Sequence, residues 1–120
     1  MPRRLVVKVT AGADDPERCA QAFTVASVAV ASGADVSLWL TGEASWFALP
    51  GRAAGFELAG SAPLEELLAA VLAEGAVHLC TQCAARRGIT EADLVDGVRI
   101  AGAAEFVSSV LEADVQALVY

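Results

Sequence analysis

The sequence predicts one α/β domain whose mostly parallel sheet contains about five strands. Short apolar runs rich in β-branched residues alternate with helical patterns along the chain, and the links between them are short. This alternation is typical of βαβ units with right-handed crossovers. Hydrophobic residues make up 56% of the 120 residues, which fits strands buried on both faces and further surface covered by other subunits. No repeat, low-complexity tract or linker divides residues 1–120.

The first strand is followed by the best-marked helix of the chain. Asp14 or Asp15 is expected to cap it, with Pro16 and Glu17 in its first turn, and Gly33 ends it after about residue 32. Four residues spaced by three or four positions form its core-facing stripe: Cys19, Phe23, Ala26 and Val30. Strands are expected at residues 4–10, 35–41, 76–80, 98–101 and 115–120.

The other helices carry weaker signals. Pro50 stops a short helix over residues 43–49, and residues 51–60 form a loop. Ser61 is expected to cap a helix over residues 62–74, and residues 90–93 have the spacing of a capping box. Further helices are expected at residues 82–87, 90–95 and 103–113.

Composition excludes several classes of protein. The net charge of −7 and the pI near 4.5 argue against a nucleic-acid-binding protein, which needs a basic face. No apolar run is long enough to span a membrane, and the N-terminal pattern does not fit a signal peptide. The protein is therefore expected to be cytoplasmic. In a reducing compartment, three cysteines indicate reactivity or packing rather than a disulfide framework.

The stretch HLCTQCAARRGI, from His78 to Ile89, concentrates the reactive residues. Cys80 ends a strand, and the carboxyl ends of parallel strands are where ligands bind in open α/β sheets. Helix amides facing Cys80 would lower the pKa of its thiol. Cys83 lies in the first helical turn, and Arg86 and Arg87 follow at i+3 and i+4, where they stabilise a thiolate or an anion, or simply the helix end.

Other interpretations of Cys80 and Cys83 stay open. Cys80 and Cys83 have the spacing of a redox pair. A zinc site within one chain is not expected, because there is no second pair and His78 is the only histidine. A site shared between subunits remains open. A dinucleotide site would require GxGxxG after the first strand, which residues 11–14 do not supply, so no cofactor is expected.

The CxxCxxxRG segment from Cys80 to Gly88 resembles that of DsrE/TusD-type proteins, and the resemblance extends over almost the whole chain, from VVKVTAGADD to VQALVY. It implies a three-layer α/β/α, flavodoxin-like domain that forms homo-oligomers, either trimers or hexamers. Members of the sulfur-relay branch carry a persulfide on the cysteine that stands eight residues before the glycine of the Arg-Arg-Gly triplet, which is Cys80 in this sequence. Cys83 matches a second cysteine of less defined role. Protein partners that supply and accept sulfur are also implied.

Several residues outside the pair are candidates for supporting roles. His78 lies on the same side of its strand as Cys80 and is a possible tuner of the thiol, or a hydrogen-bonded structural histidine. The loops after the first two strands are expected to line a pocket with Gly12, Ala13, Thr41 and Gly42. Trp46, Phe47 and Leu49 form an apolar cluster that packs in the core, caps the cysteine pocket or meets another subunit. Buried Cys19 is expected to act as a small hydrophobe.

Three functions are therefore compared. The first is a persulfide carrier that uses Cys80, with Cys83 as an accessory thiol. The second is a thiol–disulfide redox protein in which Cys80 and Cys83 cycle together. The third is a non-enzymatic oligomeric binding module in which the cysteines are incidental.

Overall fold

The computed structural model describes residues 3–120 and contains a five-stranded sheet in the order β4-β3-β2-β1-β5. The strands are β1 (Arg4–Val9), β2 (Asp35–Leu40), β3 (Ala76–Cys80), β4 (Val98–Ala101) and β5 (Val115–Val119). Every pairing between neighbouring strands in these residues is parallel. The predicted class, with about five mostly parallel strands, is confirmed.

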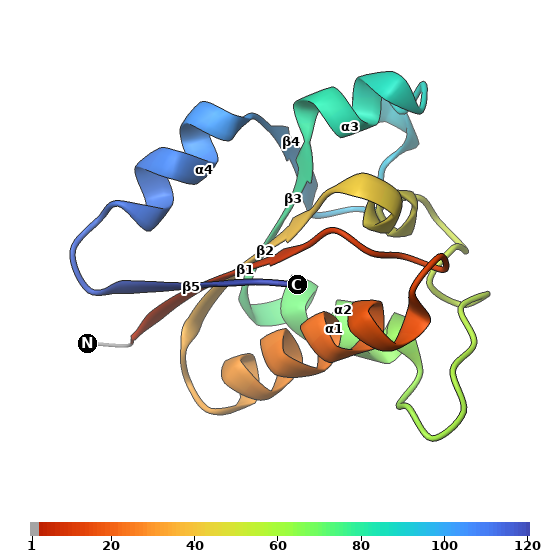
Figure 1. Ribbon diagram of the computed structural model, residues 1–120, viewed down its shortest axis with the longest axis horizontal. Helices are drawn as coiled ribbons and strands as arrows, with labels where there is room; N and C mark the ends of the chain where they lie inside the picture. Colours follow the sequence, from red (N-terminus) through yellow and green to blue (C-terminus); the bar gives the residue numbers. More distant parts are fainter. Residues whose placement is uncertain (1–2) are drawn as a thin grey trace.

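Helices lie on both sides of the sheet (Figure 1). α1 (Pro16–Ala31) and α2 (Leu64–Glu74) cover one face, whereas α3 (Thr81–Arg86) and α4 (Ala103–Val110) lie on the other. Two short 3-10 helices, η1 (Gly42–Ala48) and η2 (Glu91–Asp93), follow β2 and α3. This arrangement confirms the three-layer, flavodoxin-like fold that the resemblance implied.

The main core lies between the sheet and the α1 and α2 helices. Strand residues that point to this side are almost completely buried: Val7, Val9, Leu38, Leu40, Val77 and Leu79. From α1, Cys19, Phe23 and Ala26 are fully buried as predicted, and Val30 packs against the cluster while partly exposed. Burial of this apolar surface is the dominant contribution to folding.

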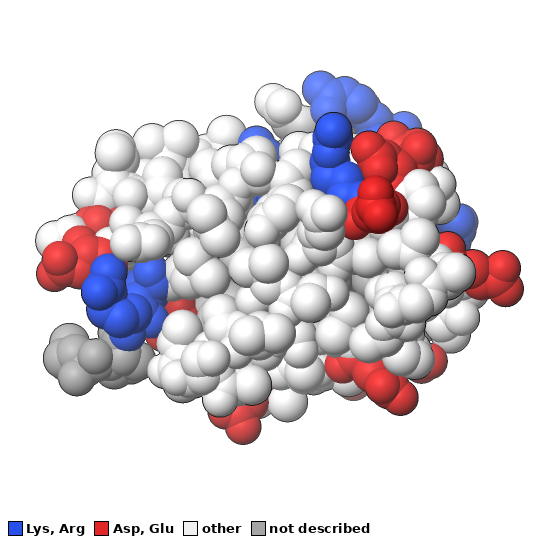
Figure 2. All heavy atoms as spheres, turned by 60° about the horizontal axis from the view of Figure 1, so that its bottom comes forward, with Lys and Arg blue, Asp and Glu red and all other residues white. Residues whose placement is uncertain are grey.

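The opposite face of the sheet is covered less completely. A small cluster of Val6, Trp39 and Ala101 packs under Phe106 and Val110 of α4. Leu111 at the end of α4 is 77% exposed and Val119 on the edge strand β5 is 64% exposed. On the α1 side, Figure 2 shows few charged side chains over the middle of the surface.

The ends of the helices follow the sequence signals with three exceptions. Asp15 caps α1 by accepting a hydrogen bond from the Arg18 amide, and the capping box from Thr90 to Asp93 is present. Ser61 does not cap α2; the helix begins after Pro63, and the Ser61 hydroxyl bonds to the Ala62 carbonyl instead. α4 ends at Val110 rather than residue 113, and the brief helix expected over residues 90–95 is a three-residue 3-10 turn.

Two glycines let the loops at the carboxyl edge of the sheet come into close contact. A Cβ atom on Gly12 would lie 2.5 Å from the Glu43 carbonyl oxygen. A Cβ atom on Gly42 would lie 2.4 Å from the Thr10 carbonyl oxygen, and Gly42 also has a φ of +52°. Both contacts are with backbone atoms, so neither can be relieved by rotating a side chain.

Within residues 3–120, no helix has the length and apolar character needed to cross a membrane.

The close contact at Gly12 predicts how a substitution there changes the free energy of unfolding. Gly12→Ala should lower the free energy of unfolding by about 1–3 kcal/mol, because the loops after β1 and β2 must separate. Gly55→Ala is the matched control, since its Cβ atom would meet its nearest neighbour at 3.6 Å and Gly55 lacks a positive φ. Urea unfolding of both variants checks this, and equal midpoints for the two would show that the close contact carries no stability.

Candidate functional site

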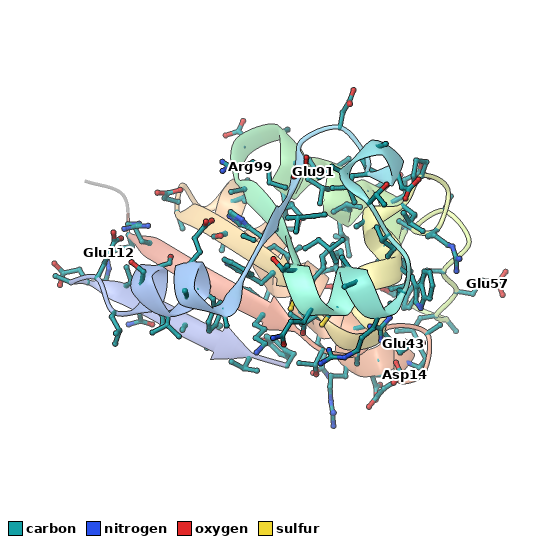
Figure 3. All side chains as sticks on the ribbon, turned by 90° about the horizontal axis from the view of Figure 1, so that it is seen from above. Asp14, Glu43, Glu57, Glu91, Arg99 and Glu112 are labelled. Carbon is teal, nitrogen blue, oxygen red and sulfur yellow. The ribbon has the colours of Figure 1, made fainter. Side chains whose placement is uncertain are left out.

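The candidate site lies at the carboxyl edge of the sheet, where three loops meet. β1 leads into the loop that contains Gly12, β2 into the turn at Thr41 and Gly42, and β3 directly into α3. Asp14 and Glu43 lie at the same end of the molecule when it is seen from above (Figure 3). The topology thus brings the predicted loop residues next to the cysteine segment.

Cys83 is the thiol that the loops hold most closely. The Gly42 amide donates a hydrogen bond to its Sγ atom at 3.3 Å, and the cysteine is 8% exposed. A backbone amide aimed at sulfur stabilises a thiolate more than a thiol, because the charged acceptor binds the donor more strongly. This contact joins α3 to the turn after β2.

The pKa of the Cys83 thiol is accordingly lowered. Burial raises this pKa, but the Gly42 hydrogen bond opposes that effect. The Cys80 side chain, the Arg87 charge and the Ser45 hydroxyl lower it further, and the net result is a pKa below the ordinary value. Ser45 is fully buried, and its hydroxyl has no hydrogen-bond partner within residues 3–120.

Cys80 lies beside Cys83 but in different surroundings. It is half-buried, it precedes the first residue of α3, and its side chain caps none of the helix amides. The expected contact between Cys80 and the α3 amides is therefore absent, because the amide that reaches a sulfur comes from the turn after β2. All three cysteines of the chain are free thiols.

Arg86 and Arg87 have different surroundings in the structure. Arg87 follows the last residue of α3, where its guanidinium donates to the Cys83 carbonyl oxygen at 3.2 Å and to the Glu43 carboxylate at 2.8 Å. Its side chain is 17% exposed and that of Glu43 is 46% exposed, so this ion pair is only partly shielded from solvent. Arg86 is exposed on the last turn of α3. Only Arg87 adds a charge effect to Cys83.

The loop residues that were predicted to line the pocket mainly fix the backbone around the site. Thr41 is buried and its hydroxyl donates to the Val9 carbonyl oxygen at 2.9 Å, which fixes the turn from which Gly42 reaches Cys83. The Gly12 amide donates to the Asp14 carboxylate at 2.8 Å. Ala13 is exposed and lines a neighbouring pocket together with Glu43.

His78 precedes Cys80 on β3 and stacks on Trp39 of β2, with ring centroids 4.5 Å apart. Burial lowers the pKa of His78, Glu105 opposes this effect and Arg99 adds to it. The imidazole is therefore neutral at pH 7. Its Nδ1 atom and the Trp39 Nε1 atom are buried without a hydrogen-bond partner.

Cys19 is chemically distinct from the pair. Burial raises the pKa of its thiol to about 12, and Asp14 and Asp15 add to that effect. It therefore remains a neutral thiol in the α1 stripe. In the described part of the chain, no group of three or more His, Cys, Asp or Glu residues is placed to hold a metal ion.

The sequence did not indicate Ser45, which belongs to the irregular segment after β2. Gly42 was expected to line the pocket, but neither its hydrogen bond to Cys83 nor the pairing of Glu43 with Arg87 was predicted. The short spacing from Thr41 to Ser45 was the only available signal, because a turn at the carboxyl end of a strand is a common position for functional groups.

Comparisons with known proteins place the chain in a family. The model of the DsrE/DsrF-like family matches residues 3–116. The crystal structure of the YchN protein from E. coli superimposes with a TM-score of 0.80 at 25% identity, over 100% of both chains. The protein of unknown function MTH1491 from Methanobacterium thermoautotrophicum shares the fold, with a TM-score of 0.74 at 10% identity over 98% of this chain and 99% of that one.

No curated protein is significantly similar in sequence. Since the family match covers nearly the whole chain, the protein belongs to the DsrE/DsrF-like family.

Proposed function

We propose that this protein carries sulfur as a persulfide on Cys80, with Cys83 as the thiolate that takes up the Cys80 proton. Membership of the DsrE/DsrF-like family supports a role in sulfur relay in general terms. The observation that carries the assignment to this pair is the hydrogen bond from the Gly42 amide to Cys83 Sγ. That bond favours a negative sulfur directly beside a more exposed thiol.

The different exposure of Cys80 and Cys83 supports different roles for their two sulfurs. Exchange requires a donor persulfide to reach the attacking sulfur, and Cys83 is only 8% exposed. Cys80 is half-buried and is the more accessible of the two. Cys83 is available to accept a proton because the Gly42 amide and the Arg87 charge favour its deprotonated form.

The transfer balances without an oxidant or a reductant. As the Cys80 proton moves to Cys83, Cys80 Sγ attacks the outer sulfur of the donor persulfide, and the donor leaves as a thiolate. Cys80 then holds the outer sulfur. An acceptor thiolate attacks that sulfur, Cys80 leaves, and it regains its proton from Cys83. Proteins are the expected donor and acceptor, and a reducing compartment such as the cytoplasm would keep the pair available.

A redox function is the second candidate, because Cys80 and Cys83 are neighbours and interact. In that case the two thiols would lose two electrons and two protons to an external disulfide and form a bond to each other. A stable disulfide after mild oxidation would favour this function over sulfur carriage.

Persulfide labelling tests the carrier role. Incubation with an organic persulfide should add one or more increments of about 32 Da to the Cys80 peptide, as seen by mass spectrometry. Cys80→Ser should abolish the adduct, and Cys83→Ser should slow its formation on the order of tenfold or more, because the proton acceptor is lost.

Cys19→Ser provides the control, since Cys19 is fully buried and should never be labelled. An adduct that persists in Cys80→Ser, or a wild-type protein that takes up no sulfur, would rule out the assignment. Alkylation of Cys80 and Cys83 at the rate of a model thiol would favour the non-enzymatic binding module.

The charge of Arg87 should be visible in the reactivity of Cys83. Arg87→Gln removes a positive charge that stabilises the thiolate, so it should raise the pKa of Cys83 and shift its alkylation profile to higher pH. Site-resolved mass spectrometry of iodoacetamide labelling between about pH 5 and 10 measures this shift. Arg86→Gln is the matched control because Arg86 is exposed and does not affect Cys83. Equal shifts in the two variants would contradict the role of Arg87.

The exposed apolar surface of α4 and β5 supports a homo-oligomer, and a trimer or hexamer is the expected form. Large hydrophobic residues are exposed on this surface: Val107, Leu111, Leu118 and Val119. β5 is also an edge strand, which leaves one side of its backbone open to pairing.

Light scattering after size-exclusion chromatography should therefore report an assembly for the wild type. Leu111→Glu should dissociate it, whereas Val28→Glu on α1, where Val28 is 58% exposed, should leave it intact. A monomeric wild type would refute the proposal, and dissociation by Val28→Glu alone would contradict the placement of the interface.

A further inference from the structure

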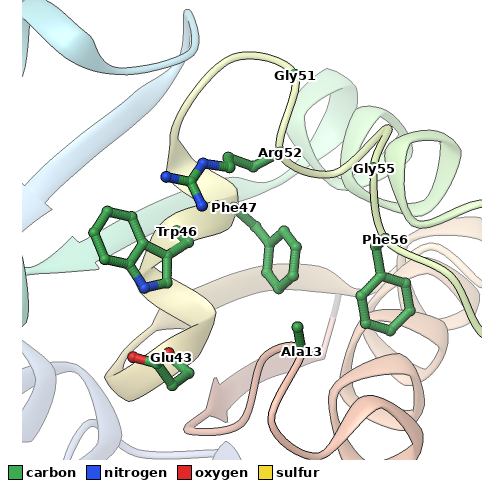
Figure 4. A pocket seen from close by; sticks show the side chains of 8 residues that line it. All are labelled: Ala13, Glu43, Trp46, Phe47, Gly51, Arg52, Gly55 and Phe56. Carbon is green, nitrogen blue, oxygen red and sulfur yellow. The ribbon is translucent and has the colours of Figure 1, made fainter.

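A pocket of about 360 Å³ lies beside the thiol site but does not include either sulfur. It is formed by η1, the loop after β1 and the loop that follows η1 (Figure 4). Its lining residues are Ala13, Glu43, Trp46, Phe47, Gly51, Arg52, Gly55 and Phe56. The volume is at the lower end of the range of roughly 300–1,000 Å³ that small-molecule sites span.

Aromatic rings form most of the apolar wall. Phe47 is 5% exposed and packs edge-to-face against the buried Phe23, with centroids 6.0 Å apart. Phe56 meets Phe47 in the same manner at 5.6 Å. Trp46 is half-buried on the other side of the pocket (Figure 4). The predicted cluster is thus divided, with Phe47 fixed in the core and Trp46 left partly open.

The charged residues of the lining are one cation, Arg52, and one anion, Glu43, and Arg87 lies next to the pocket. The Arg52 guanidinium lies 4.6 Å from the Trp46 ring centroid, and that of Arg87 lies at 5.9 Å. Glu43 is paired with Arg87 at 2.8 Å, so its charge is largely offset. Within residues 3–120, Arg52 has no carboxylate at salt-bridge distance. The charge left without a partner in this pocket is therefore positive.

This combination selects one chemical class of ligand. A guanidinium binds carboxylates and sulfonates through two parallel hydrogen bonds, and aromatic walls bind a flat apolar body. A cationic ligand is disfavoured, since guanidinium groups already lie against Trp46. The chain has 15 acidic against 8 basic residues, so an anion would be held only where a local cation is available.

We propose that this pocket binds a small organic anion, with Arg52 holding its carboxylate or sulfonate and Trp46, Phe47 and Phe56 enclosing its planar body. Glu43 follows Gly42, the residue that binds Cys83, so an occupied pocket would lie one residue from the thiol site. The binding itself does not require either cysteine. It is therefore independent of the proposed sulfur chemistry.

The probe for this site is 2-naphthalenesulfonate, a planar anion, and 2-naphthol serves as its uncharged analogue. Calorimetric titration of the full chain should give saturable binding of the sulfonate and weaker binding of the naphthol. Arg52→Gln should weaken sulfonate binding about tenfold or more, because a charge-assisted contact is lost. Arg99→Gln on β4 is the matched control, since it removes an exposed arginine outside this pocket and should not change the affinity.

The two tryptophans provide a readout that locates the binding. The indole N–H signal of Trp46 in a nitrogen–proton correlation spectrum should shift during the titration, while that of Trp39, which is 3% exposed under α4, should not. Trp46→Phe assigns the two signals. Unchanged thermal unfolding of Arg52→Gln would show that this exposed substitution leaves the fold intact.

Retained binding in Cys80→Ser and Cys83→Ser separates this site from the sulfur proposal. No saturable binding, an affinity unaffected by Arg52→Gln, or a shift at Trp39 instead of Trp46 would each overturn the assignment. Equal affinity for the sulfonate and the naphthol would also overturn it, because the pocket would then recognise only an apolar body.

Discussion

The candidate site depends on close contact between backbone segments at the carboxyl edge of the sheet. Gly12 meets the Glu43 carbonyl and Gly42 meets the Thr10 carbonyl, which leaves no room for a Cβ atom at either glycine. These contacts hold the turn after β2 in position beneath α3, so that the Gly42 amide reaches Cys83. The lowered pKa of Cys83 and the ion pair between Glu43 and Arg87 both follow from this arrangement.

Much of the fold could be predicted from the sequence because its strands are short, apolar and clearly bounded. β3 and β4 have the predicted limits, since glycines precede both strands. The start of α2 was wrong because Ser61 is a good cap only if the helix begins beside it, and Pro63 sets the start instead. The order of the strands depends on which loops pack together, and local sequence signals carry little information about that.

The site could be located but not fully described in advance. Cys80 and Cys83 were identified from their position at the end of β3 and in the helix that follows, and the structure places them as neighbours. The stabilising amide comes from Gly42, 41 residues before Cys83, and a contact at that separation has no local pattern. The divergence of Arg86 and Arg87 depends on where α3 ends, which is the least predictable part of a short helix.

The hydrogen bond to Cys83 has a consequence for how such a site changes during evolution. Its donor belongs to the main chain, so substitution of Gly42 by any residue except proline would keep the N–H group itself. What a substitution there would change is the path of the turn, through the φ of +52° and the contact with Thr10. Selection on the reactivity of this sulfur therefore acts on loop geometry, and the property is inherited with the shape of the fold.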